Sequence, residues 1–176
     1  METIELIKSK IREIPNWPKK GVNFKDITPL LQDKDAFRKT IDLLAKPYLK
    51  KRVDKIVGID ARGFILAAAL AYKLKAGLSI VRKKGKLPAK TVSKAYTLEY
   101  ASNTLEMHKD AFSPGEKIVL VDDVLATGGT MKATIDLVEQ LKGKIAGVDF
   151  LIELPYLKGR KSLKGYKIRS LAKYEK

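Results

Sequence analysis

Two neighbouring carboxylates followed by a glycine-rich turn form the stretch of the sequence with the clearest chemical potential. It reads VLVDDVLATGGTMKA over residues 119–133, and its apolar start ends at Asp122 and Asp123. Ionised carboxylates only accept hydrogen bonds, whereas glycines let several backbone N–H groups converge on one anion. The stretch therefore suits a ribose 5-phosphate, which presents one phosphate and a vicinal diol. The candidate phosphate-binding residues are Ala126, Thr127, Gly128, Gly129 and Thr130. The alternative is a plain turn followed by an ordinary helix cap.

Other motifs of phosphate and hydrolytic chemistry are absent from the sequence. Gly58 and Gly63 have the spacing of P-loop glycines, but Phe64 and Ile65 stand where Lys and Ser/Thr are required. The single histidine, His108, is better explained as a surface or packing residue than as a catalyst. The chain has no cysteine, which excludes disulfides and thiolate metal sites.

The charge of the chain is strongly basic, with 36 Lys and Arg against 20 Asp and Glu and a formal net charge of +16. Such a field attracts polyanions, so nucleic acid and small polyphosphates are both candidates. A lysine-rich solvated surface explains the excess equally well. The lysines are spread along the whole chain and no helix-turn-helix is evident, which disfavours specific nucleic-acid binding. There is no apolar run of membrane-spanning length and no signal peptide, so we expect a cytoplasmic protein that does not bind membranes.

The elements that must position these residues alternate along the chain. Continuous apolar runs predict buried strands over residues 53–59, 77–82, 117–121 and 145–154, and helical spacing predicts helices over 35–46, 64–74 and 131–141. The pattern is that of one α/β domain with a parallel, twisted sheet flanked by helices. Isoleucines at 4, 7, 11 and 14 predict a first helix that ends at Pro15. Residues 83–104 have no clear period, which is typical of a functional lid or a disordered loop.

The stretch from Val119 to Met131 resembles the phosphoribosyl pyrophosphate (PRPP) motif of the type I phosphoribosyltransferases. The resemblance covers nearly the whole chain and is closest to the members of that family that act on adenine. It implies the family's fold, with an N-terminal helix and base-binding segment, or hood, over residues 1–34 and a mobile catalytic loop over 83–104. The other similar segments are PNWPKKGVNFKDITPLLQD (15–33), VGIDARGFILAAALA (57–71), VRKKGKLPAKT (81–91), YTLEYAS (96–102) and GRKSLKGYKIRSLAKY (159–174).

The resemblance implies a reaction of purine salvage, in which adenine N9 displaces pyrophosphate from C1 of Mg²⁺-bound PRPP and AMP is formed. Asp122 and Asp123 would then bind the ribose hydroxyls, and residues 126–130 would hold the 5-phosphate. The loop of Asp60, Ala61 and Arg62 would meet the pyrophosphate, with a cis peptide expected at Asp60–Ala61. Further cations for the leaving group, from the same or the neighbouring subunit, are Arg82, Lys83 and Lys86.

On the base side, the resemblance makes Glu99 the acid–base group that exchanges a proton with N7 or N9 of the purine. Phe24 would stack on adenine, and backbone groups around Asn23 and Lys25 would read its edge. The alternatives are a solvated loop charge for Glu99 and a core aromatic for Phe24. Two residues depart from the family's pattern, because Lys25 stands where Arg is frequent and Ala101 where Gly is usual.

The resemblance also implies partners: Mg²⁺ held mainly through PRPP and water, the substrates adenine and PRPP, and a second copy of the chain in a homodimer. Two rival functions remain open from the sequence. One is a phosphoribosyltransferase for another purine, such as xanthine. The other is a PRPP-sensing regulator that binds RNA or DNA, which the net charge of +16 motivates.

Overall fold

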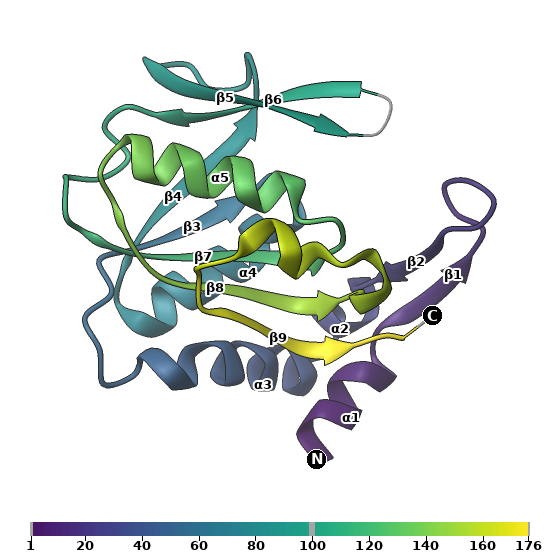
Figure 1. Ribbon diagram of the computed structural model, residues 1–176. Coiled ribbons are helices and arrows are strands. Elements are labelled where there is room, and N and C mark those ends of the chain that lie inside the picture. The colour runs from purple at the N-terminus through teal and green to yellow at the C-terminus, as the bar shows by residue number, and fades with distance from the viewer. Residues whose placement is uncertain (1, 99–100, 176) are drawn as a thin grey trace.

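The centre of the fold is a seven-stranded sheet with the strand order β5-β6-β4-β3-β7-β8-β9 (Figure 1). The structure, a computed structural model, describes residues 2–98 and 101–175. Five strands are parallel to their neighbours, and β6 and β5 extend the sheet antiparallel at one edge. The predicted α/β fold with a parallel sheet is therefore confirmed. The strands are β3 (Lys55–Ile59), β4 (Gly77–Lys83), β5 (Thr91–Leu98), β6 (Ala101–His108), β7 (Lys117–Leu125), β8 (Lys144–Glu153) and β9 (Ile168–Lys173).

Helices cover both faces of the sheet, which explains why its strands are continuously apolar. Val119 and Val121 of β7 belong to the core beneath α1 (Glu2–Ser9), α3 (Lys34–Ala45) and α4 (Arg62–Leu74). The alternate residues Ile118 and Leu120 belong to the core beneath α5 (Gly129–Gln140). The period-2 alternation of a strand thus feeds two apolar layers from one run of residues. The predicted helices over 35–46, 64–74 and 131–141 all form, each within two residues of its predicted start.

The N-terminal segment differs from the prediction of one helix up to Pro15. Helix α1 ends at Ser9, and Ile14 lies instead in strand β1 (Arg12–Pro15), which pairs antiparallel with β2 (Asn23–Asp26). Arg12 supports this pairing through an ion pair with Asp26, with 2.7 Å between Nη2 and Oδ2. Tertiary pairing has outweighed the helical spacing of the isoleucines. A short helix α2 (Thr28–Gln32) then leads into α3.

Two further segments contain regular structure that the sequence did not predict. Much of 83–104 is the antiparallel β5–β6 hairpin, which lies next to α5 (Figure 1). Residues 159–174 form a 3₁₀ helix, η3 (Gly159–Leu163), and then β9; the shorter 3₁₀ turns η1 (Lys46–Tyr48) and η2 (Pro155–Leu157) connect other elements. Within the described part of the chain, no helix is long and apolar enough to cross a membrane. The cytoplasmic location stays a prediction.

Candidate active site

A cleft of roughly 540 Å³ lies at the carboxyl ends of the parallel strands. These ends face the side of the molecule where β1 and β2 lie (Figure 1). Ligands of open parallel sheets bind at this edge. Residues from β2, the ends of β3, β4 and β7, and the turn after β8 share the lining. Of the residues predicted from the sequence, the cleft brings together Asn23, Phe24, Lys25, Asp60, Ala61, Arg62, Lys83, Asp122, Asp123, Ala126 and Thr130.

Asp122 and Asp123 lie in the second half of β7, which extends four residues beyond its predicted end. Asp123 is 6% exposed, and its backbone N–H donates to Asp122 Oδ1 at 3.0 Å. Burial, and then the charge of Asp123, raise the pKa of Asp122 well above its usual range. Burial also raises the pKa of Asp123, although the nearby Arg62 opposes this. Arg62 Nε lies 2.6 Å from Asp123 Oδ2, but that oxygen has no aligned hydrogen-bond donor. The oxygen is buried, and the Arg62 guanidinium is its charge partner.

The phosphate loop, residues 126–130, lies next to these carboxylates. It lines a smaller hollow of about 70 Å³ that shares Asp122, Ala126 and Thr130 with the cleft. Gly128 has a φ of +85°, which side-chain-bearing residues rarely adopt, and precedes the first residue of α5. The unpaired N–H groups and the positive dipole end of α5 are therefore directed at the hollow. Phosphate binding by residues 126–130 stays a prediction.

The 3₁₀ helix η3 supports the phosphate loop from behind, a role that the sequence did not predict. Ser162 Oγ donates to Thr127 O at 3.1 Å. A Cβ on Gly128 would lie 2.6 Å from Gly159 O, and a Cβ on Gly159 would overlap Ala126 O. The two backbones therefore pack directly together, and only glycine fits at these two points. The phosphate loop and η3 are some thirty residues apart in the chain, so no local sequence pattern predicts their contact.

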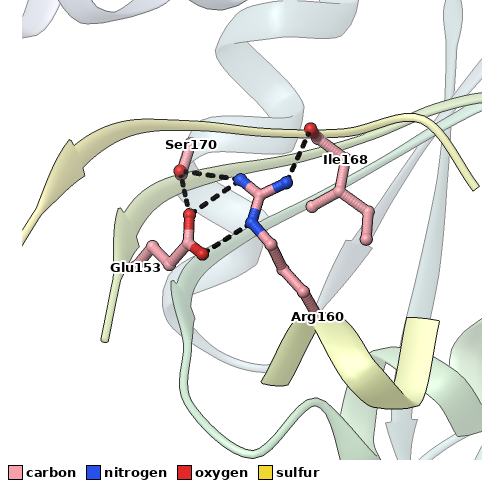
Figure 2. Close-up of polar contacts among 4 residues, drawn as sticks. All are labelled: Glu153, Arg160, Ile168 and Ser170. Carbon is pink, nitrogen blue, oxygen red and sulfur yellow. Dashed lines mark hydrogen bonds and ion pairs between the residues drawn. The ribbon is translucent and has the colours of Figure 1, made fainter. Parts of the chain in front are cut away.

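A polar cluster fixes η3 to the sheet (Figure 2). Arg160 is bidentate to Glu153 at the end of β8, with Nε–Oε1 and Nη2–Oε2 distances of 2.6 and 2.8 Å. Arg160 also donates to Ile168 O at 3.2 Å and to Ser170 Oγ at 3.3 Å, both on β9. The hydrogen bond from Arg160 holds the pKa of Glu153 below its usual range, although burial opposes it. This cluster sets the position of the residues that support the phosphate loop.

On the base side, strand alternation separates Phe24 from its two neighbours. The Phe24 ring packs edge-on against Trp17, with 4.4 Å between centroids, and the Arg62 guanidinium carbon lies 4.9 Å from its centroid. The side chains of Asn23 and Lys25 instead bind Glu13 Oε2, at 2.6 and 2.5 Å. Hydrogen bonds from Lys25 and Asn23 lower the pKa of Glu13.

Lys25 is 5% exposed, and its Nζ lies 4.4 Å from the centre of the Tyr174 ring. Its charge is therefore matched by Glu13 and Tyr174. What Lys25 offers to a base in the cleft is its backbone rather than its ammonium group. The reading of the purine edge by backbone atoms stays a prediction, and the contacts with Glu13 and Tyr174 are the local surroundings of the residue that departs from arginine.

On the pyrophosphate side, the Asp60–Ala61 peptide is cis, as the resemblance implied. Arg82 Nε donates to Asp60 Oδ2 at 2.8 Å, and Arg82 Nη1 donates to Lys86 O at 3.0 Å. Lys83 lines the cleft, but Arg82 and Lys86 are not among its lining residues. Arg82 therefore organises the loop around Asp60, while Arg62 and Lys83 are the cations exposed to the cleft.

Glu99, the expected acid–base group, lies outside the described residues. Several cleft residues were not predicted as site residues, among them Val22, Tyr96, Tyr156 and Leu157. Tyr156 and Leu157 follow the carboxyl end of the predicted strand 145–154, and that position is the signal that could have found them.

Basic and acidic residues are equally numerous in the described lining of the cleft. Three cations, Lys25, Arg62 and Lys83, face three carboxylates, Asp60, Asp122 and Asp123. Among residues 2–98 and 101–175, no three His, Cys, Asp or Glu side chains gather as metal ligands. Binding of Mg²⁺ mainly through PRPP and water stays a prediction.

A second hollow, of roughly 460 Å³, lies at the opposite, amino edge of the sheet. Lys117 and Lys144, the first residues of β7 and β8, are direct neighbours there. The basic residues in its described lining are Lys50, Lys51, Arg52, Lys117 and Lys144, and the described lining holds no carboxylate. A cluster of basic residues thus lies at the edge of the sheet opposite the cleft.

Comparison with known proteins agrees with this geometry. A family profile described as phosphoribosyl transferase domain matches residues 27–170. The chain is 54% identical to an adenine phosphoribosyltransferase of Trichlorobacter lovleyi over 171 residues, covering 97% of this chain and 100% of that one. The chain belongs to the phosphoribosyltransferase family.

Comparison with solved structures indicates which members of the family the chain resembles. The adenine phosphoribosyltransferase of Thermoanaerobacter pseudethanolicus superposes with a TM-score of 0.94 at 53% identity, covering 97% and 99% of the two chains. The enzyme of Saccharomyces cerevisiae, solved with adenine and an imino-altritol bisphosphate, gives 0.92 at 35% identity, covering 97% and 98%. Within its family, the chain belongs with the adenine phosphoribosyltransferases.

Proposed function

We propose that the chain transfers the 5-phosphoribosyl group of PRPP to N9 of adenine and releases AMP and pyrophosphate. The observation that carries this proposal is the single cleft that joins an aromatic ring, a buried carboxylate pair and a helix-start phosphate loop. These three groups match the base, the ribose diol and the 5-phosphate of the reactants. The expected division into a base-binding segment, residues 1–34, and a catalytic loop, residues 83–104, is part of the proposal.

The sugar is held by β7 and the phosphate loop. Backbone N–H groups of residues 127–130 and the hydroxyls of Thr127 and Thr130 donate to the 5-phosphate. Asp122 and Asp123 accept from the ribose hydroxyls, and their negative charge favours the positive charge that grows on the sugar in the transition state. Mg²⁺, when bound with PRPP, neutralises the pyrophosphate and aids its departure.

The leaving group and the base are handled on either side of the sugar. As the N9–C1 bond forms, the C1–O bond breaks and its electron pair leaves with pyrophosphate, toward Arg62 and Lys83. Phe24 stacks on adenine, and the backbone of Asn23 and Lys25 reads its polar edge. The proton released from the purine passes to Glu99, a contribution worth about 10²–10⁴-fold in rate.

A homodimer is also proposed, and an apolar stripe supports it. Ile65, Ala68 and Tyr72 follow one face of α4 at intervals of three and four residues and are exposed, Tyr72 to 90%. Leu78 on β4 is exposed as well. Exposed apolar stripes of this kind mark protein interfaces. Sedimentation of the Tyr72→Glu variant as a monomer, beside a dimeric wild type, would support the assignment.

The test of the function is AMP formation from adenine, PRPP and Mg²⁺, run beside hypoxanthine, guanine and xanthine. Turnover selective for adenine is expected. Efficient turnover of another purine without adenine turnover would overturn the substrate. PRPP binding without turnover of any base would favour the regulator.

A paired variant tests the site itself. Asp123→Asn should lower kcat/KM for PRPP by at least about 10²-fold, because a charge next to the developing cation is lost. Asp42→Asn is the matched control, since Asp42 forms an exposed ion pair with Lys73 on the helical face, and it should keep full activity. Equal activity of the two variants would contradict the role given to Asp123.

A further inference from the structure

Tyr96, a residue of the β5–β6 hairpin, contacts the phosphate loop. Its ring packs beside the start of α5, where a Cβ on Gly129 would lie 3.6 Å from Tyr96 Cδ2. Its hydroxyl lies 3.4 Å from Thr130 Oγ1, and the tyrosine also lines the cleft. The hairpin therefore touches a residue to which the proposed function gives the 5-phosphate.

Tyr96 is one of three alternate side chains of β5 that face α5. Val92 packs against the core beneath that helix, and Lys94 Nζ lies 3.0 Å from Asp136 Oδ2. These two contacts involve no proposed substrate ligand, so substrate does not change them directly. Tyr96 alone of the three contacts such a ligand, and it precedes Glu99 by three residues in the sequence.

The chemistry of the two hydroxyls makes their contact sensitive to phosphate. An O–H···O hydrogen bond is usually about 2.7–2.8 Å long, so 3.4 Å is a weak contact. Here Thr130 donates to Tyr96. A phosphate oxygen competes for the threonine proton, and Thr130 Oγ1 then becomes an acceptor for the tyrosine O–H. Two consecutive hydrogen bonds that end on an anion are stronger than an isolated hydrogen bond between two hydroxyls.

We propose that Tyr96 is a positioning residue that couples occupancy of the phosphate loop to docking of the β5–β6 hairpin on α5. The proposal rests on the proposed function, because Thr130 must bind the 5-phosphate. Phosphate binding strengthens the Tyr96 contact and holds the hairpin on the helix. By thermodynamic reciprocity, the docked hairpin tightens phosphate binding by the same factor.

Limited trypsin digestion with ribose 5-phosphate as the probe tests the coupling, because the hairpin segment contains Lys86, Lys90 and Lys94. Saturating ribose 5-phosphate should slow cleavage there in the wild type. Tyr96→Phe keeps the ring but should lose this protection, and should bind ribose 5-phosphate about 3- to 10-fold more weakly, as for one hydrogen bond. Thermal unfolding confirms that the variant is folded.

Two further variants separate coupling from a structural effect. Tyr166→Phe is the matched control: its hydroxyl bonds Glu139 Oε1 at 2.6 Å toward the other end of α5, and protection should persist. In a Thr130→Val background, Tyr96→Phe should not weaken ribose 5-phosphate binding any further, since the partner hydroxyl is already gone. Should Tyr96→Phe not fold, Thr130→Val at saturating ribose 5-phosphate must itself lose protection.

Two results would overturn the coupling. One is that ribose 5-phosphate protects Tyr96→Phe from trypsin as it protects the wild type. The other is that Tyr96→Phe weakens ribose 5-phosphate binding further in the Thr130→Val background. A wild type that does not bind ribose 5-phosphate would overturn the proposed function instead, so the two failures are distinguishable.

Discussion

The phosphate loop and the β5–β6 hairpin both border the cleft, but they are held in different ways. The loop is backed by direct backbone packing against Gly159 and by the Arg160–Glu153 cluster, in which Glu153 is 4% exposed. The hairpin contacts α5 through Val92, which packs against the core beneath the helix, through the half-exposed Lys94 and through a long tyrosine–threonine contact. Half-exposed polar contacts contribute little free energy, so the polar part of this contact holds the hairpin less firmly than the loop is held. The cleft therefore combines a closely packed phosphate loop with a hairpin whose polar contacts to α5 are weaker.

The largest effect on stability and affinity is expected at Gly159, where the backbone of η3 packs directly on the phosphate loop. Gly159→Ala would place a methyl group onto Ala126 O, so η3 or the loop must move. We expect the free energy of unfolding to fall by about 3 kcal/mol, the upper end for overpacking, and ribose 5-phosphate affinity to fall at least about 10-fold. Urea unfolding and calorimetric titration measure the two.

Gly129→Ala is the comparison variant, because its added methyl would lie 3.6 Å from Tyr96, an ordinary contact. Its unfolding free energy should stay within about 1 kcal/mol of the wild type. If both alanine variants behave alike, the loop is not fixed by close packing.

A smaller effect is expected from the cluster behind the loop. Arg160→Ala leaves the buried Glu153 carboxylate without its bidentate partner. Loss of one partner of a buried pair costs about 3–5 kcal/mol, and we expect about 2 kcal/mol because the Arg160 side chain is 42% exposed. Arg160→Lys should restore part of the lost free energy of unfolding. A variant as stable as the wild type would show that η3 does not depend on this cluster.

The same pair gives a pH signature with a defined sign. The folded-state pKa of Glu153 is below its ordinary value of 4.5, so its stabilisation is present above pH 4.5 and lost as pH falls through the folded pKa. The stability difference between wild type and Arg160→Ala should therefore be full at pH 7 and shrink on acidification below 4.5. A difference that grew in acid would contradict the assignment.

The smallest effect is expected in the hairpin. Lys94→Ala removes a half-exposed ion pair, and Asp136 keeps Lys132 as a partner. Global stability should change by less than about 0.5 kcal/mol, while tryptic cleavage after Lys86 and Lys90 becomes faster. High salt should abolish this difference by screening the pair. A large loss of global stability would mean that the hairpin is as firmly built in as the loop.

The same two regions show what the sequence could and could not predict. The phosphate loop was found because its donors, from Ala126 to Thr130, are contiguous and follow a buried strand. Its support by Gly159 and Arg160 was missed because these contacts form between distant segments. The hairpin was missed because the charged Lys94 lies between Val92 and Tyr96 on the face of β5 toward α5, so β5 has no clean apolar alternation.

Side-chain direction was equally beyond the sequence. The position of Lys25 on the base-binding segment was predicted, and the residue does line the cleft. Its ammonium group binds Glu13 instead, because β1 and β2 pair where a longer first helix was expected. The early end of α1 at Ser9 is therefore what gives Lys25 its partner.

The balanced cleft and the basic amino edge should behave differently toward dissolved salt. Polyanions at the lysine-lined edge release condensed counterions, so their binding weakens steeply as ionic strength rises. A small phosphate held by backbone N–H groups between paired charges is much less screened. Nucleic acid carried along from a cell extract should therefore wash off at moderate salt while ribose 5-phosphate affinity barely changes. The formal charge of +16 would then be a property of the outer surface and its ion atmosphere, separate from the chemistry of the cleft.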